Sequence, residues 1–281
     1  MFIYFNGKIV SSEECVVSPL DHGFLYGHGL FETMRSYKGR VFRLVDHMKR
    51  METSAGYLGW PVLPDREVFA EAVNSVLVTN NLPDASVRLT VSRGIGAARP
   101  DAASCGQPTI AVYASPLPKP LPAAGWSLTT VSLRRNLSSP LVKIKSANYL
   151  DNMLARAEAK KRGAHEAIML NTDGLVAEGS MSNIFIVSNG RLITPDGESG
   201  ILLGITRNAV ILLAQAAGIT VEERKVNPEE LAEADEIFLT SSIMEVIPVT
   251  VLDGRPVGHA PVPGETTLML AQSYRKLAES E

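Results

Sequence analysis

The 281-residue chain is predicted to adopt an α+β fold in two domains, and three observations support this. Short β-prone runs are joined by the hairpin dipeptides Asn6-Gly7, Asp173-Gly174 and Asn189-Gly190. Between these runs, apolar residues recur at the spacing of a helix face. Four prolines fall within residues 115–125, where neither a helix nor a central strand can continue. Hairpins interspersed with helices indicate an α+β fold rather than a doubly wound parallel sheet.

The proline-rich segment is the one break in composition along the chain. A segment of this kind forms a stiff, extended spacer between domains. We therefore expect a small N-terminal domain over residues 1–115, a linker over 116–125 and a larger domain over 126–281.

The first domain is expected to contain a hairpin around Asn6-Gly7, two helices and further strands. The helix over 44–58 carries apolar residues at helical spacing, and Asp65 is the expected cap of a second helix over 66–77. Strands are expected over 87–92 and 109–114. Helices and strands therefore both contribute to the smaller domain.

In the larger domain, short strands and helices are expected to alternate more closely along the chain. Leu150, Met153 and Leu154 lie on one face of a helix that ends at Gly163. The other elements expected there are a helix over 206–217, a C-terminal helix from residue 265, and strands over 127–133, 167–170, 175–177, 183–187, 192–194, 237–240 and 246–251.

The composition excludes several functional classes. Hydrophobic residues make up 45% of the chain and charged residues 20%, which is typical of a globular protein. The net charge of −3 and the lack of a basic patch argue against a nucleic-acid partner. We see neither a signal peptide nor an apolar run that could cross a bilayer, so we expect no membrane association. Cys15 and Cys105 lie far apart without a CxxC motif, which fits the reducing cytoplasm.

Three familiar catalytic patterns are absent from the sequence. Gly94-Ile95-Gly96 opens like a dinucleotide-binding fingerprint, but Arg99 stands at its last position and no helical pattern follows. Residues 179–183 lack the second glycine of a nucleophile elbow. The five histidines show no metal-ligand spacing, so we expect no metal site. Hydride transfer, serine hydrolysis and zinc chemistry therefore have no support.

Two lysines, Lys143 and Lys145, lie among apolar residues at an expected strand-to-helix junction. An apolar setting lowers the pKa of a lysine and yields the neutral amine that forms a Schiff base. The structural alternative is a basic edge on a strand. Because the two lysines flank Ile144 and share one face, spacing alone does not choose between them.

Three later segments suggest a binding pocket. Glu178 ends a strand before a loop of small residues, an arrangement that builds a pocket wall. Residues 200–207 form a glycine-flanked loop that opens a helix, where N–H groups can hold a phosphate. The strand ending at Thr240 is followed by two serine hydroxyls. The structural alternatives are a solvated turn at Glu178 and an ordinary helix cap at Thr206. Each segment alone is a weak signal, but the lysine segment and these three in this order are a strong one.

With these segments in this order, the chain resembles the fold-type IV pyridoxal-phosphate enzymes: branched-chain aminotransferases, D-amino acid aminotransferases and aminodeoxychorismate lyases. The resemblance covers nearly the whole chain and includes residues 4–7, 21–27, 29–35 and 39–44. It implies a small α/β domain and a larger domain with a β-barrel-like core and flanking helices. It also implies a homodimer in which the small domain of one subunit closes the site of the other.

The resemblance implies the cofactor pyridoxal 5′-phosphate and assigns residues to it. Lys145 matches the lysine that carries the cofactor covalently, which favours it over Lys143. Glu178 matches the carboxylate that faces the pyridine nitrogen, and Arg43 matches the arginine that grips the phosphate. The remaining positions are Tyr149 near the phenolic oxygen, Leu202 against the ring, and Ile205, Thr206, Ser241 and Ser242 around the phosphate.

The implied reaction is transfer of an amino group between an amino acid and a 2-oxo acid by ping-pong turnover. Related lyases often have Asn where this chain has Ser241, which favours the aminotransferases. Phe31 stands where D-specific enzymes tend to have Tyr, which favours branched-chain substrates. Aminodeoxychorismate lyase, which forms p-aminobenzoate and pyruvate, and D-amino acid aminotransferase remain alternatives. The candidate substrate-binding residues are Phe31, Arg88, Arg99 and Ile243.

Overall fold

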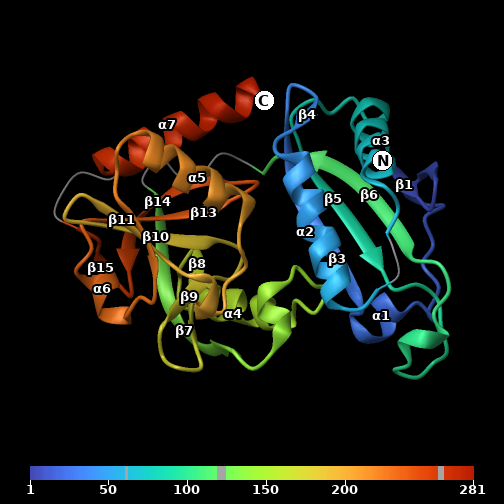
Figure 1. Cartoon of the computed structure of the whole chain (residues 1–281), viewed down its shortest axis with the longest axis horizontal. Helices are drawn as coiled ribbons and strands as arrows, with labels where there is room; N and C mark the ends of the chain where they lie inside the picture. The colour runs from blue at the N-terminus through green and yellow to red at the C-terminus, as the bar shows by residue number, and fades with distance from the viewer. Residues whose placement is uncertain (61–62, 119–124, 259–262) are drawn as a thin grey trace. The chain divides into compact units, whose positions relative to one another are not determined.

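A computed structural model describes residues 1–60, 63–118, 125–258 and 263–281 (Figure 1). The chain forms two compact units, which consist of Met1–Pro118 with Ile144–Asn148 and Glu281, and of Lys119–Lys143 with Tyr149–Ser280. Residues 119–124 of the expected linker lie outside the described residues, so the domain boundaries stay a prediction. The units differ from that prediction at Ile144–Asn148, which groups with the first unit.

The first unit is built on a six-stranded antiparallel sheet in the order β2-β1-β6-β5-β3-β4. Its strands are β1 (Phe2–Phe5), β2 (Lys8–Ser11), β3 (Gly29–Tyr37), β4 (Arg40–Val41), β5 (Ala85–Ser92) and β6 (Thr109–Pro116). Its helices are α1 (His22–Tyr26), α2 (Leu44–Tyr57) and α3 (Arg66–Thr79). The hairpin predicted at Asn6-Gly7 joins β1 to β2, and both residues have the positive φ that such a turn requires.

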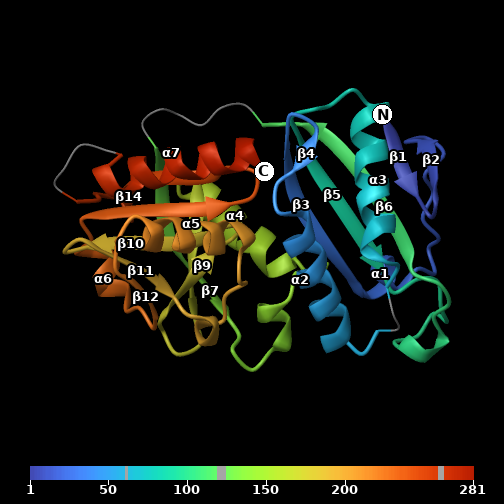
Figure 2. The same ribbon diagram turned by 45° about the horizontal axis from the view of Figure 1, so that its top comes forward.

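The two faces of this sheet differ in burial. Along β5, Val87 and Leu89 are fully buried, whereas Arg88 and Thr90 are half-buried. Helix α2 packs against β3, and α3 lies across β1, β5 and β6 (Figure 2). The helices therefore cover the apolar face, and Arg88 lies on the opposite face.

The segment that carries Lys145 extends this sheet at β3. The Phe31 amide donates to the carbonyl of Lys145 at 3.0 Å, and the Ala147 amide donates to the carbonyl of Gly29 at 2.7 Å. Leu30 and Ser146 form the bridge between these two bonds. This pairing explains why residues 144–148 group with the first unit, although they are far from it in sequence.

The second unit contains a nine-stranded mixed sheet in the order β12-β11-β10-β13-β14-β7-β8-β9, with β15 beside β14. Its strands are β7 (Trp126–Arg135), β8 (Glu166–Asn171), β9 (Val176–Gly179), β10 (Asn183–Ser188), β11 (Arg191–Pro195), β12 (Val221–Arg224), β13 (Glu236–Ser241), β14 (Glu245–Leu252) and β15 (Arg255–Pro256). Strand β9, at one end of this order, also contacts β10 and β11, so the sheet curls toward a barrel.

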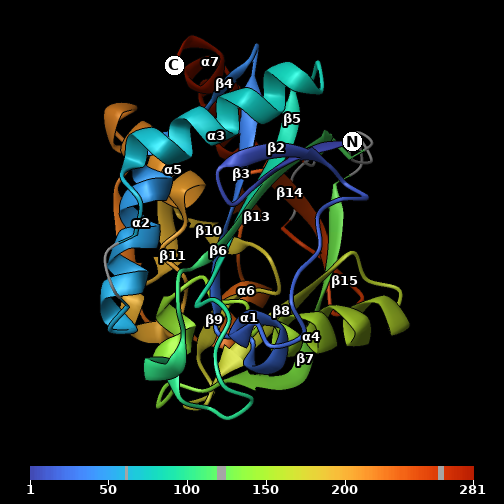
Figure 3. The same cartoon turned by 90° about the vertical axis from the view of Figure 1, so that its right-hand side faces the viewer.

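Among the described residues, four α-helices flank this curled sheet: α4 (Leu150–Lys161), α5 (Ile205–Ala216), α6 (Pro228–Ala232) and α7 (Glu265–Ser280). Helices α5 and α7 pack against each other, and α7 runs along β14 (Figure 2). Helix α4 lies on β7 and β8 (Figure 3). No helix among the described residues has the length and hydropathy to traverse a lipid bilayer.

Helix α4 presents its apolar side outward. Leu150 is 64% exposed, Met153 63% and Leu154 51%, whereas Asn152 and Ala155 are buried against the sheet. Helical spacing places the three apolar residues on one face, but it does not say which way that face points. Side chains of this kind in water mark a surface that another molecule covers.

Candidate active site

Glu178, at the end of β9, is the centre of a buried polar cluster in the second unit. Its carboxylate makes a 2.9 Å ion pair with Arg135 and accepts hydrogen bonds from the Asn183 amide at 3.1 Å and the Leu202 backbone at 3.0 Å. The Asn183 amide also donates to the Leu202 carbonyl at 2.8 Å. Glu178 and Arg135 are almost completely buried. The cluster therefore holds a carboxylate in one orientation beside Leu202.

Tyr149 is held beside the loop that follows Glu178. Its hydroxyl donates to the Ser180 carbonyl at 3.1 Å, and the Asn152 amide donates to the same oxygen at 2.8 Å. The Ser180 hydroxyl in turn donates to the buried Glu166 carboxylate. Burial raises the pKa of Glu166, although its hydrogen bonds from Ser180 and the charge of Arg156 act to lower it. The Ser180 loop is thus fixed from both sides, and Tyr149 with it.

The predicted phosphate-binding residues lie at two chain turns of the second unit. Ile205 and Thr206 form the first turn of α5, where backbone N–H groups have no partner within the helix. Ser241 and Ser242 begin the turn between β13 and β14, and the Ser241 hydroxyl accepts from the Met244 amide at 3.2 Å. A helix N-terminus together with hydroxyl groups is a suitable donor set for a phosphate.

The packing around this donor set also fits a polar ligand. Thr240 is 1% exposed, and its hydroxyl has no hydrogen-bond partner among the described residues. Thr240 pairs with Asn183 across β13 and β10, so both side chains lie on one sheet face. A Cβ on Gly204, the cap of α5, would overlap the Asn183 amide oxygen. A buried donor without a partner beside a glycine-capped helix fits a polar group such as a phosphorylated ring.

Lys145 lies in a second cluster, in the first unit. Its Nζ is 4.5 Å from the centroid of the Phe31 ring, and the guanidinium carbon of Arg88 is 3.7 Å from the same centroid. Arg88 Nε also donates to the Thr90 hydroxyl at 3.2 Å. Two cations therefore share one aromatic ring on the sheet face that the helices leave uncovered. Three sequence-predicted residues, Phe31, Arg88 and Lys145, meet here.

Beneath this face, Glu32 of β3 forms a buried network with two residues of α2. It accepts from His47 Nδ1 at 2.7 Å and from Arg50 Nε at 2.9 Å and Nη2 at 2.6 Å. Burial acts to raise the pKa of Glu32, but Arg50 and His47 outweigh it and hold the pKa at about 2. Burial lowers the pKa of His47, although its contact with Glu32 acts in the opposite direction. This network ties α2 to the strand that carries Phe31.

Arg43 caps α2 with a positive φ of 54°, an unusual backbone conformation for a long side chain. Its guanidinium lies 2.9 Å from the Glu281 carboxylate and 3.6 Å from that of Asp46. The side chain is thus already arranged to bind oxyanions, and a phosphate here would take the place of a carboxylate.

Two further predicted residues lie outside these clusters. Arg99 is 72% exposed and pairs with Asp101 at 3.2 Å on a loop of the first unit. Ile243 lies in the β13–β14 turn of the second unit, beside Ser242. The described residues include no group of His, Cys, Asp and Glu that could hold a metal ion.

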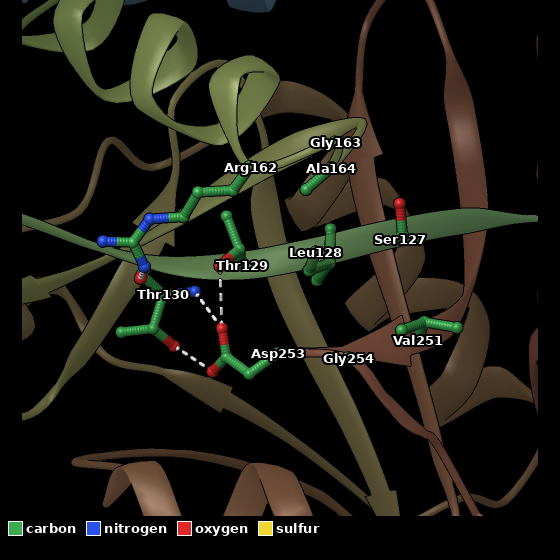
Figure 4. A pocket seen from close by; sticks show the side chains of 10 residues that line it. All are labelled: Ser127, Leu128, Thr129, Thr130, Arg162, Gly163, Ala164, Val251, Asp253 and Gly254. Atoms are coloured by element: carbon green, nitrogen blue, oxygen red, sulfur yellow. Dashed lines mark hydrogen bonds between the residues drawn. The ribbon is translucent and has the colours of Figure 1, made fainter.

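A surface cavity of about 590 Å³ lies apart from the polar clusters of the second unit, beside β7 and the β14–β15 turn (Figure 4). The Asp253 carboxylate at its wall accepts from the Thr129 hydroxyl at 2.9 Å and from the Thr130 amide and hydroxyl at 2.7 and 2.8 Å. These bonds lock the turn and engage both carboxylate oxygens. None of the predicted cofactor-binding residues lines this cavity.

Sequence reasoning missed several members of these clusters. Arg135 and Asn183 hold Glu178, but they come from different strands and share no motif with it. The Glu32 network was missed because its members lie on a strand and a helix, and only packing brings them together. The one signal in the sequence was a carboxylate at position 32, which shares a strand face with the apolar residues Leu30 and Met34.

Comparison with known proteins gives one consistent result. Residues 29–252 match the family model described as amino-transferase class IV. A putative branched-chain-amino-acid aminotransferase of Methanocaldococcus jannaschii is 42% identical over 99% of this chain and 96% of its own length. An aminodeoxychorismate lyase of Bacillus subtilis is 35% identical over 98% and 94%. A D-alanine aminotransferase of Bacillus licheniformis is 34% identical over 95% and 93%.

Solved structures agree with these relatives. A branched-chain aminotransferase from Thermoproteus uzoniensis, solved with norvaline, superposes with a TM-score of 0.91 at 37% identity and covers 100% of this chain and 96% of its own. The branched-chain amino acid aminotransferase from Thermobaculum terrenum, solved in its PLP form, has a TM-score of 0.88 at 30% identity, over 99% and 94%. The expected α+β fold, enzyme class and pyridoxal-phosphate cofactor are thereby confirmed. The chain belongs to the class IV aminotransferase family.

Proposed function

We propose that this enzyme transfers the amino group of a branched-chain L-amino acid to a 2-oxo acid, with pyridoxal 5′-phosphate bound to Lys145. The observation that carries the substrate assignment is the Phe31 ring, whose centroid lies 4.5 Å from Lys145 Nζ and 3.7 Å from the guanidinium carbon of Arg88. An aromatic wall beside the reactive amine suits a hydrocarbon side chain, and the guanidinium suits the second carboxylate of a dicarboxylic 2-oxo acid. The relatives named as branched-chain aminotransferases support this choice.

Each site residue then has a role that follows from its chemistry. The cofactor, when bound, supplies an electron sink that stabilises negative charge on the substrate α-carbon. Lys145 Nζ would take up the α-proton of the substrate and return it, as general base and acid. Glu178, oriented by Arg135, Asn183 and the Leu202 amide, holds the proton of the ring nitrogen.

The remaining residues bind and orient. Arg43 and Thr206 bind the phosphate, together with the first-turn amides of α5 and the hydroxyls of Ser241 and Ser242. Tyr149 lies at the phenolic oxygen, where its hydroxyl is positioned by Ser180. We assign Ile243 and Arg99 to substrate binding. Arg99 would have to break its ion pair with Asp101 to contact the substrate.

We also propose that the enzyme is a homodimer of the cytoplasm. The exposed apolar triplet Leu150, Met153 and Leu154 supports a second copy as its cover, and the two free thiols fit a reducing compartment. Size-exclusion chromatography with light scattering tests the dimer. Met153→Lys is expected to give monomers, and Leu212→Lys, at an exposed apolar position on α5, is the matched control. A monomeric wild type, or equal effects of both variants, would refute this interface.

The half-reaction tests the function. The purified yellow enzyme is mixed with one amino acid, and the cofactor absorbance is followed. Bleaching by L-leucine or L-valine, reversed by 2-oxoglutarate, is the expected result. Bleaching by D-alanine alone would identify the D-specific alternative, and pyruvate with p-aminobenzoate from aminodeoxychorismate would identify the lyase.

A pair of lysine variants controls this experiment. Lys145→Ala is expected to abolish turnover. Lys143→Ala is expected to retain it, because Lys143 is 49% exposed and pairs with Glu198 at 2.9 Å. Multiple turnovers by the Lys145→Ala enzyme would show that the assignment is wrong.

A further inference from the structure

We infer that Tyr274 of α7 is a positioning residue for the cofactor phosphate and acts through the hydroxyl of Thr206. Its phenolic oxygen lies 3.3 Å from Thr206 Oγ1. The inference rests on the proposed function, in which Thr206 binds the phosphate. No other residue of α7 has a proposed role in the site.

Both hydroxyl groups are buried. Tyr274 is 1% exposed and Thr206 is 2% exposed. Tyr274 belongs to the inward face of α7, with Leu270 and Ala278 one turn away on either side. A buried phenol needs a hydrogen-bond partner, and the Thr206 hydroxyl lies within reach of this one. The contact with Thr206 therefore depends on the hydroxyl at position 274, and phenylalanine could not make it.

The number of protons sets the direction of this bond. A threonine hydroxyl has one proton to donate and can accept as well. When Thr206 donates that proton to a phosphate oxygen, its contact with Tyr274 is a hydrogen bond only if the phenol donates. The phenol then orients the threonine hydroxyl toward the anion and makes it a stronger donor.

Helix α7 also contacts the second phosphate-binding turn. Arg275, next to Tyr274, lies 3.5 Å from the carboxylate of Glu245, which closes the β13–β14 turn after Ser241 and Ser242. At its start, the Thr267 hydroxyl and amide donate to Glu236 of β13 at 2.6 and 2.8 Å. One rigid helix therefore holds both the first turn of α5 and the hydroxyl turn.

The test compares two ligands that differ only by the phosphate. Apo-enzyme is titrated with pyridoxal 5′-phosphate and with pyridoxal, and the dissociation constants are measured from the absorbance of the bound cofactor. Tyr274→Phe is expected to weaken binding of the phosphorylated form about fivefold, the typical value of one hydrogen bond. Binding of pyridoxal should change by less than about twofold, because it does not use Thr206. Tyr57→Phe, an exposed tyrosine on α2, is the matched control.

Thr206→Val completes a double-mutant cycle. In that background the Tyr274→Phe change is expected to have no further effect on phosphate affinity. Equal loss of affinity for both ligands, or the same loss in the Thr206→Val background, would show that Tyr274 has a general structural role and would refute the inference. Wild-type enzyme that binds no pyridoxal 5′-phosphate would overturn the proposed function and this inference with it.

Discussion

Replacing Glu32 by Gln tests the buried network beneath Phe31. The substitution keeps the size and an acceptor for His47, but it removes the charge that opposes Arg50. Glu32 is 1% exposed, so water cannot replace the lost partner. We therefore expect a large loss of stability from a change of a few atoms.

The size of the loss follows from the pKa. The network lowers the pKa of Glu32 from 4.5 to about 2, which corresponds to about 3 kcal/mol of stability at neutral pH. Because the pKa is lower in the folded protein, the unfolded chain binds more protons between these values. The stabilisation is therefore complete above pH 4.5 and is lost as the pH falls toward 2.

The two tryptophans allow the first unit to be followed alone. Trp60 lies in that unit and donates to His28 at 2.9 Å, whereas Trp126 lies in the second unit. In a Trp126→Phe background, urea unfolding is followed by Trp60 fluorescence at pH 7 and pH 3.5. Glu32→Gln should lower the free energy of unfolding by about 3 kcal/mol at pH 7 and by clearly less at pH 3.5.

Glu52 provides the control, because its pair with Arg66 is well exposed. Exposed pairs contribute at most about 1 kcal/mol, so Glu52→Gln should change little. Equal losses from Glu32→Gln and Glu52→Gln, or a loss from Glu32→Gln that does not change with pH, would refute the reasoning.

Three further predictions concern the site. Glu178→Gln should lower kcat by about hundredfold or more while the cofactor stays attached, as seen from its absorbance; an unchanged kcat would contradict the assigned role. Gly204→Ala should weaken cofactor binding about tenfold in a fluorescence titration, since a Cβ would displace Asn183, and unchanged affinity would exclude this tight contact. Arg88→Met should raise KM about tenfold for 2-oxoglutarate and much less for a monocarboxylic 2-oxo acid; equal changes would argue against a carboxylate contact.

Local patterns predicted the elements well. The conformation of a tight turn is set by the residues of the turn itself, and the turns at Asn6-Gly7 and Asn189-Gly190 form where expected. Helix α5 begins one residue before the predicted start at 206, and α7 begins at the predicted Glu265. Spacing within one element is a local property, so a single sequence carries it.

Contacts between distant segments could not be predicted in the same way. The outward direction of Leu150 and Met153 depends on how α4 packs against β7 and β8, which helical periodicity does not specify. Arg135 reaches Glu178 only after three strands have paired. The grouping of residues 144–148 with the first unit depends on an edge of β3 that the sequence does not mark. The resemblance assigned roles to individual residues such as Glu178. It did not identify the neighbouring residues, such as Arg135, that fix their side chains in place.

The most direct test of the account is the identity of the lysine that carries the cofactor. The holoenzyme is reduced with borohydride, which fixes a covalently held coenzyme on its amine, and the peptides are then mapped by mass spectrometry. We predict that the phosphopyridoxyl group is found on Lys145. Its appearance on Lys143, or on any other lysine with Lys145 unmodified, would contradict the central claim.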